Sequence, residues 1–133
     1  MTYIGNMAFY DCYELHDIAI PDSVTDIGGG VFSYCNTLKS VTLPNTLKEL
    51  KLCHILCDGN ICGEVGFFHG CTALEHIKLP DNLITLGTYA FSDCYSLKDI
   101  VFPNTLETIE QQAFEACGIE SIIIPNSVTS IGN

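Results

Sequence analysis

The chain has 133 residues, of which 47% are hydrophobic, 16 are acidic and 5 are lysine, with no arginine. This length corresponds to one domain, and a formal net charge of −11 argues against partners such as nucleic acid or an anionic membrane surface. No apolar run approaches the roughly 18 residues of a membrane helix, so we expect no membrane insertion, and no signal peptide is visible.

A repeat of about 23 residues is the main signal in the sequence. Each copy carries an isoleucine or leucine, a phenylalanine five residues later, a cysteine three residues after that, and alternating apolar residues before a proline. Successive prolines are 23, 36, 23 and 22 residues apart, so the longest gap is one copy with 13 residues inserted between Leu50 and Phe68. The copies are marked by Pro21, Pro44, Pro80, Pro103 and Pro125.

The segments that carry this pattern are close to a known consensus. "IPDSVTDIG" and "IPNSVTSIG" nearly repeat one phrase, and the match extends from Ile4 to Gly132 apart from the inserted residues. The pattern resembles the BspA-like (Treponema pallidum-type) leucine-rich repeats, whose unit reads roughly "IGxxAFxxCxxLxxIxIPxSVTx". The resemblance implies a non-catalytic module for protein binding or adhesion that is secreted or held at the cell surface. Because the chain shows no signal peptide, a cytoplasmic location stays open.

In physical terms, each copy should form one coil of an α/β repeat, a leucine-rich-repeat solenoid of about five to six coils over residues 1–133. The "SVTxIG" segment should be extended along one wall. The "AFxxC" segment is too short for a long helix and is predicted to form short helical or 3₁₀ turns. The "LxxIxIP" segment alternates as a strand does, with Leu97, Ile100 and Phe102 directed inward, so these strands should stack into a parallel β ribbon.

Two columns of equivalent residues should run through the core. Parallel side chains in one column are poorly placed for disulfides, and a cysteine packs as a small apolar residue where the chain turns. We therefore expect buried free thiols rather than a redox or metal ladder, with a column of phenylalanine rings beside them. The thiols are Cys12, Cys35, Cys71, Cys94 and Cys117, and the rings are Phe9, Phe32, Phe68, Phe91 and Phe114.

The insertion contains "CHILCDGNIC" at residues 53–62, with three cysteines and one histidine. Its alternation on either side of "DGN" predicts a β-hairpin. Free thiols in a small satellite core are the favoured interpretation, and a Cys57–Cys62 disulfide or a metal site that includes Cys53 are the alternatives. Zinc sites usually use paired spacings such as C-x₂-C, which this segment lacks. The sequence therefore predicts no metal and no cofactor, and a metal- or redox-responsive insertion is only a third hypothesis of function.

The outward positions of the ribbon form the predicted binding face, because they alternate with the core positions of each strand. Their side chains are small and mixed in charge and identify no ligand, so the expected partner is a protein or a cell-surface ligand. The face comprises Asp17, Ala19, Ser40, Thr42, His76, Lys78, Asp99, Val101, Ser121 and Ile123.

No catalytic motif is recognisable, since the chain has neither G-x-S-x-G nor H-E-x-x-H, and we predict that it is not an enzyme. The alternative function is a structural spacer or a fragment of a longer repeat array. Strands near residues 15–20 and 119–124 should leave unpaired backbone groups at the two open ends of the solenoid. Homo-oligomers through these ends are therefore expected, above all at Ile122–Ile124, where no lysine opposes strand pairing.

Overall fold

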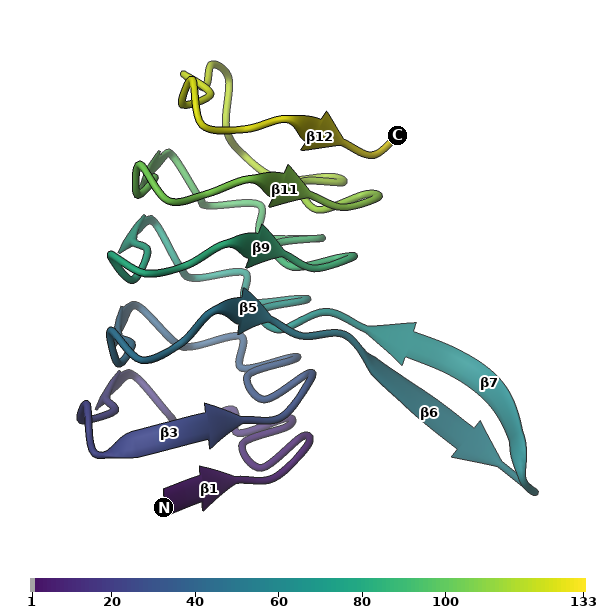
Figure 1. Ribbon diagram of the computed structural model, residues 1–133. Coiled ribbons are helices and arrows are strands. Elements are labelled where there is room, and N and C mark those ends of the chain that lie inside the picture. Colours follow the sequence, from purple (N-terminus) through teal and green to yellow (C-terminus); the bar gives the residue numbers. More distant parts are fainter. Residues whose placement is uncertain (1) are drawn as a thin grey trace.

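The computed structural model describes residues 2–133, which wind into a stack of coils of about 23 residues each (Figure 1). The "SVTxIG" segments lie along one side of the stack, which we call the front wall, and their strands run parallel. Each strand is short because the chain must turn at both sides of a coil. The front wall consists of β1 (Thr2–Ile4), β3 (Val24–Ile27), β5 (Glu49–Leu50), β9 (Thr85–Leu86), β11 (Thr108–Ile109) and β12 (Ser130–Ile131).

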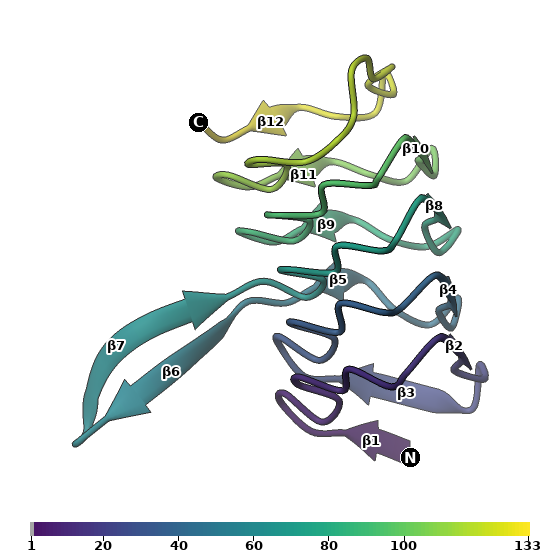
Figure 2. The same cartoon turned by 180° about the vertical axis from the view of Figure 1, so that it is seen from behind.

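The "LxxIxIP" segments form the predicted parallel ribbon on another side of the stack, at the right edge of Figure 2. Their register is in step with the repeat, so that Ile18 lies beside Val41 and Ile77 beside Ile100. These middle residues point into the core, and the residues on either side of them are exposed. The ribbon consists of β2 (Asp17–Ala19), β4 (Ser40–Thr42), β8 (His76–Lys78) and β10 (Asp99–Val101).

Both sides of the stack are interrupted at the same step, between the second and third coils. Over residues 2–133, β3 forms no ladder with β5, and β4 forms none with β8. The turn segments, which contain the "AFxxC" motifs, hold this step together instead. The backbone N–H of Phe32 donates to the carbonyl of Phe67 (3.0 Å), and the Ser33 hydroxyl donates to the carbonyl of Gly66 (2.6 Å). The third coil is the one that carries the insertion, so the interruption coincides with it.

The prediction of helical or 3₁₀ turns is wrong, because the described residues contain no helix and the "AFxxC" segments are runs of tight turns. Most coils hold two left-handed residues there, for example Tyr89 (φ 57°) and Asp93 (φ 59°). A left-handed residue cannot continue a right-handed helix. The solenoid is therefore an all-β structure rather than an α/β one. The left-handed positions are Met7, Gly30, Tyr89 and Gln112 before the phenylalanine, and Asp11, Tyr34, Gly70, Asp93 and Ala116 after it.

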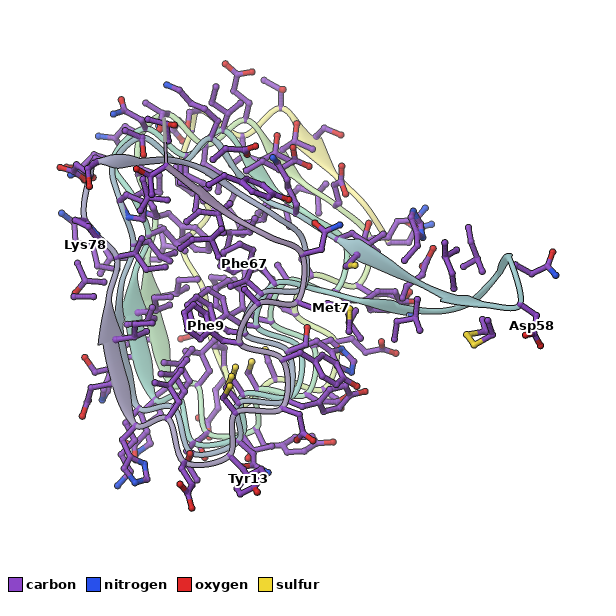
Figure 3. All side chains as sticks on the ribbon, turned by 90° about the horizontal axis from the view of Figure 1, so that it is seen from below. Met7, Phe9, Tyr13, Asp58, Phe67 and Lys78 are labelled. Atoms are coloured by element: carbon purple, nitrogen blue, oxygen red, sulfur yellow. A yellow bond between two sulfur atoms is a disulfide. The ribbon has the colours of Figure 1, made fainter. Side chains whose placement is uncertain are left out.

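The predicted phenylalanine column is confirmed and forms the spine of the core. Neighbouring rings are nearly parallel, with interplanar angles from 4° to 12° and centroid distances of 5.3–5.8 Å. These distances lie in the range of offset-stacked aromatic pairs. Phe67 adds an edge-on contact to the middle of the column, and the view along the solenoid axis places Phe9 and Phe67 inside the coil (Figure 3).

The thiol column is also confirmed, since Cys35, Cys71 and Cys94 are buried and free. Each thiol donates to the carbonyl of the phenylalanine in the preceding coil, for example Cys35 Sγ to Phe9 O (2.9 Å) and Cys71 Sγ to Phe32 O (3.1 Å). Burial raises the pKa of the Cys35 thiol to about 11 and that of Cys94 to about 12. These thiols therefore stay protonated and link neighbouring coils as hydrogen-bond donors. Cys12 and Cys117 are free and half-buried.

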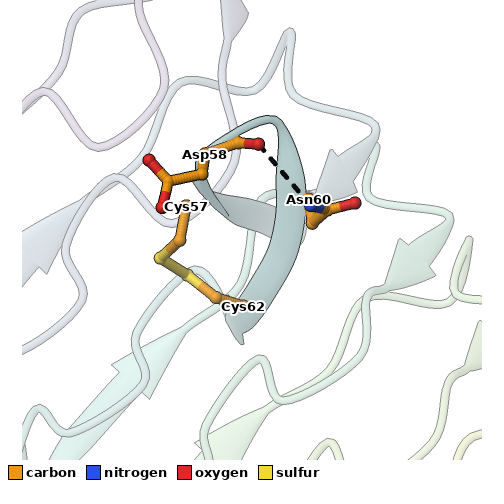
Figure 4. The surroundings of a disulfide bond; sticks show 4 residues. All are labelled: Cys57, Asp58, Asn60 and Cys62. Atoms are coloured by element: carbon orange, nitrogen blue, oxygen red, sulfur yellow. Dashed lines mark hydrogen bonds between the residues drawn. A yellow bond between two sulfur atoms is a disulfide. The ribbon is translucent and has the colours of Figure 1, made fainter.

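The insertion forms the predicted hairpin, which projects away from the stack (Figure 1). Its strands are β6 (Cys53–Cys57) and β7 (Asn60–Val65). The favoured interpretation of its cysteines as free thiols is wrong for two of them, because Cys57 and Cys62 form a disulfide with their Cα atoms 5.6 Å apart (Figure 4). Positive φ at both Asp58 and Gly59 makes a two-residue turn of the type that suits a hairpin. This turn and a register shift next to Leu56 bring the two cysteines together.

The last predicted ribbon strand is absent, because residues 119–124 are not in a strand. This copy is one residue short between Cys117 and Ile119, although its later apolar residues keep the spacing of the other copies. The Ile123 side chain is 91% exposed, as expected for an outward position. The predicted strand edge at this end is therefore wrong, while self-association remains a prediction.

Replacing Phe68 with alanine should destabilise the fold by about 3–5 kcal/mol, because it removes a fully buried ring between two stacked neighbours. The matched control is Phe9→Ala, which removes a half-buried ring with one stacked neighbour and should cost clearly less. Urea denaturation followed by circular dichroism measures both. Equal losses would show that the stack does not act as a continuous column.

Thiol counting checks the assignment of the cysteines. With Ellman's reagent at pH 8, the native protein should leave Cys35, Cys71 and Cys94 unreacted, because these thiols are buried and their pKa values lie above 9. In denaturant without reductant, six thiols should react, because the disulfide withholds two of the eight cysteines. Eight reacting thiols in denaturant would rule out the disulfide.

Candidate binding surfaces

All ten residues of the predicted binding face are exposed. Its centre is a group of polar and charged side chains on or beside β8 and β10. His76 Nδ1 lies 2.8 Å from Asp99 Oδ2, and Lys98 Nζ lies 3.0 Å from Glu75 Oε2. The hydrogen bond from Lys98 lowers the pKa of the Glu75 carboxyl, so this carboxylate stays ionised at neutral pH. The ribbon thus presents charges of both signs beside one another.

A shallow hollow lies where the ribbon is interrupted between β4 and β8. It brings together Ser40, His76, Lys78, Asp99 and Val101 of the predicted face. Lys39, Val41 and Ile77 complete its lining.

The other predicted residues lie outside this hollow. Asp17 and Ala19 continue the face on β2, in register with Ser40 and Thr42. Ser121 and Ile123 lie in the last coil, which does not extend the ribbon as a strand. The predicted residues that the structure brings together are therefore those on β4, β8 and β10, and their role in binding remains a prediction.

The turn segments carry a second surface that the sequence analysis missed. Four aromatic side chains from four successive coils contact one another in edge-to-face pairs. The ring centroids are 5.5 Å apart for Tyr10 and Tyr34, 5.0 Å for Tyr34 and His69, and 6.3 Å for His69 and Tyr89. Gly70 leaves room for the Tyr34 ring, since a Cβ on this residue would lie 2.8 Å from the ring. We call this row of side chains the aromatic ridge.

Acidic side chains border the aromatic ridge. His69 Nε2 lies 3.1 Å from Tyr34 Oη and 3.6 Å from Asp93 Oδ2, and the Tyr95 hydroxyl donates to Asp93 Oδ1 (2.7 Å). Burial lowers the pKa of the His69 imidazole, and the carboxylates of Asp93 and Glu115 oppose this effect. The pKa of the Tyr34 phenol is raised, mainly by burial and further by Tyr10 and Asp93. At neutral pH the ridge is therefore uncharged and lies beside carboxylates.

The ridge escaped the sequence analysis because its residues do not share one repeat position. Tyr10 and His69 follow the phenylalanine of their coils directly, Tyr34 follows by two residues, and Tyr89 precedes it by two. The sequence signal that was available is a compositional one, the gathering of tyrosines around the "AFxxC" segments.

The hairpin offers apolar side chains near its disulfide. Leu56 and Ile61 lie opposite each other across the two strands, and their side chains are 65% and 60% exposed. Nearer the stack, His54 Nδ1 lies 3.1 Å from Glu64 Oε1. Within residues 2–133, no group of three or more histidine, cysteine, aspartate or glutamate side chains is arranged to hold a metal ion. The same residues contain no helix with the length and hydrophobicity to cross a bilayer.

Comparison with solved structures shows what the chain is similar to. A leucine-rich repeat protein from Bacteroides ovatus matches 99% of this chain and 31% of its own length, with a TM-score of 0.79 and 33% identity. The leucine-rich repeat protein of T. pallidum matches 100% of this chain and 63% of its own length, with a TM-score of 0.77 and 28% identity.

A third similar structure is described as a leucine-rich cell surface protein from Faecalibacterium prausnitzii. It matches 99% of this chain and 39% of its own length, with a TM-score of 0.63 and 27% identity. The chain therefore spans less than two thirds of the length of each of these proteins. Among curated proteins, none matches the chain.

The family comparison agrees with the coils seen in the structure. The model of the BspA-type leucine-rich repeat region matches six copies, over residues 1–54 and 64–133. The unmatched residues fall in the hairpin, as expected for an insertion into one coil. The chain belongs to the BspA-type leucine-rich repeat family.

Proposed function

We propose that the chain is a non-catalytic module that binds another protein through the ribbon, at the hollow between β4 and β8. The observation that carries this proposal is the composition of the hollow. It combines charged side chains of both signs with the exposed apolar Val101, on a backbone held by the coils around it. A rigid surface loses little conformational entropy on binding, and mixed charges fix the register of a partner.

The polar pair in the hollow suits recognition more than stability. The side chains of His76 and Asp99 are 62% and 67% exposed, so the contact between them contributes little to folding. A partner that covers the pair removes it from water and strengthens its electrostatic contacts. The leucine-rich repeat family is generally a non-enzymatic scaffold, which agrees with this role.

Adhesion outside the cell is the setting that we propose for this binding. The Cys57–Cys62 disulfide is exposed near the end of the hairpin, and exposed disulfides of this kind persist in oxidising environments. The description of the F. prausnitzii neighbour as a cell surface protein supports the same setting.

A structural spacer is the second candidate function. The chain matches 31% to 63% of the length of two similar solved proteins, and repeats of this family stack on one another. A spacer would set the distance and orientation between the elements that it connects, and it would bind no ligand of its own. The two candidates differ in whether the hollow on the ribbon binds a partner.

The test combines site-specific crosslinking with a charge exchange. A photo-crosslinking residue at Thr42, an exposed position of β4, should capture the partner from surface extracts of the source cells. The double variant Lys78→Glu and Asp99→Lys, which leaves the net charge unchanged, should reduce binding of the captured partner by about tenfold or more.

The control is Lys48→Glu with Glu107→Lys, an equal exchange at exposed positions outside the ribbon. The control should bind as the unmodified chain does, and circular dichroism should show the same fold for all variants. If the ribbon variant keeps full affinity, the hollow is not the binding site and the spacer function is favoured.

A further inference from the structure

Charge is separated between the sides of the solenoid. The turn segments, which we define as residues 5–15, 28–38, 66–74, 87–97 and 110–118, contain five of the 6 tyrosines and none of the 5 lysines. They also contain five carboxylates, so this side of the molecule carries only negative formal charges at neutral pH. The tyrosines are Tyr10, Tyr13, Tyr34, Tyr89 and Tyr95, and the acidic residues are Asp11, Glu14, Asp93, Glu110 and Glu115.

The lysines lie elsewhere, on or beside the two strand-bearing sides. Lys78 belongs to β8, and Lys51 pairs with Asp26 of β3 at 2.8 Å. Lys98 pairs with Glu75 beside the ribbon at 3.0 Å. The carboxylates of the turn segments therefore have no lysine ion pair among residues 2–133.

The aromatic ridge is continuous along this acidic side, and two of its rings are open to solvent. Tyr10 and Tyr34 are 37% and 39% exposed, and Tyr95 is 60% exposed beside Asp93. The ridge crosses four coils, which at a strand spacing of about 4.8 Å gives a length of roughly 15 Å. An extended peptide advances about 3.4 Å per residue, so four or five residues cover this length.

We propose that this side of the solenoid binds a cationic polypeptide segment, with arginine or lysine side chains lying against the tyrosine rings and paired with the carboxylates of Asp11 and Asp93. Aromatic faces attract cations, and a carboxylate beside the ring supplies a charge-assisted hydrogen bond to the same group. Tyrosine suits such a surface, because it offers a large rigid contact area at a low cost in side-chain entropy.

The chemistry of the surface selects this partner over others. An anionic segment would meet carboxylates whose charge no lysine balances. A purely apolar segment would bury these carboxylates without a cation beside them, which costs free energy. A cationic segment satisfies both the rings and the carboxylates. This site is separate from the hollow on the ribbon and does not depend on it.

The direct test uses a fluorescein-labelled octapeptide of alternating arginine and glycine, followed by fluorescence anisotropy at 150 mM salt. A citrulline peptide of the same length keeps the shape and removes the charge, and it should bind at least about tenfold more weakly. The ribbon variant with Lys78→Glu and Asp99→Lys should bind the arginine peptide as the unmodified chain does. Failure of the ribbon proposal and failure of this one are therefore distinguishable.

Matched variants separate a local site from attraction by the net charge of −11. Asp11→Asn with Asp93→Asn should weaken binding of the arginine peptide by about tenfold. Glu107→Gln with Glu120→Gln makes the same change in net charge at exposed positions outside the turn segments and should weaken binding by less than about twofold.

The contribution of the tyrosine rings is tested with variants that leave the net charge unchanged. Tyr10→Leu with Tyr34→Leu should weaken binding by about fivefold to tenfold, and Tyr3→Leu, which removes a 59% exposed ring on β1, should leave binding unchanged. Thermal melts confirm that each variant is folded. Equal losses for the two carboxylate pairs, no loss for the tyrosine pair, or equal binding of the citrulline peptide would each overturn the proposal.

Discussion

The stacking of each coil on its neighbour is the interaction on which the whole structure depends. A single coil buries little of its own apolar surface, so its strands, turns and thiols become stable only when another coil covers them. The column of phenylalanine rings shows this most clearly, since it keeps centroid distances of 5.3–5.8 Å through five coils. It continues at 5.4 Å between Phe32 and Phe68, the step at which both strand ladders are interrupted. Thiol and hydroxyl hydrogen bonds cross the same step, from Cys71 to Phe32 O and from Ser33 to Gly66 O.

This arrangement leaves the outward positions free to differ from coil to coil. Because the inward columns supply most of the buried apolar contacts, the charges on the ribbon and the tyrosines on the turn segments do not have to recur in every coil. The two surfaces consequently have different chemistry. The ribbon side carries ion pairs such as Lys98 with Glu75, whereas the turn segments carry carboxylates without lysine partners and a row of rings. The insertion also keeps the inward columns in place. The chain leaves the third coil, forms the hairpin and returns, and the spacing of the phenylalanine column is unchanged.

The repeat determined what could be predicted from the sequence. Residues that recur at one position, such as Phe32 and Cys71, have one environment in every coil, and their columns were predicted correctly. Backbone conformation in the turns was not predictable in this way, because residues as different as Tyr89 and Gln112 share a left-handed position that no residue type marks. Structural features that occur only once and do not follow the repeat were predicted least well. The Cys57–Cys62 disulfide depends on a hairpin register shift, and the aromatic ridge depends on contacts between different repeat positions.

Amide hydrogen exchange, followed residue by residue by NMR, tests most directly whether stacking makes the coils one continuous unit. The amides of Phe32 and Tyr34 donate across the interrupted step to Phe67 O and His69 O, at 3.0 Å and 2.6 Å. If stacking carries the continuity, these two amides should exchange as slowly as those of Phe68 and Phe91, which lie in the middle of the stack, and far more slowly than amides at the hairpin turn. Exchange of the Phe32 and Tyr34 amides as fast as that of the hairpin turn would show that the first two coils open independently, and would contradict the account.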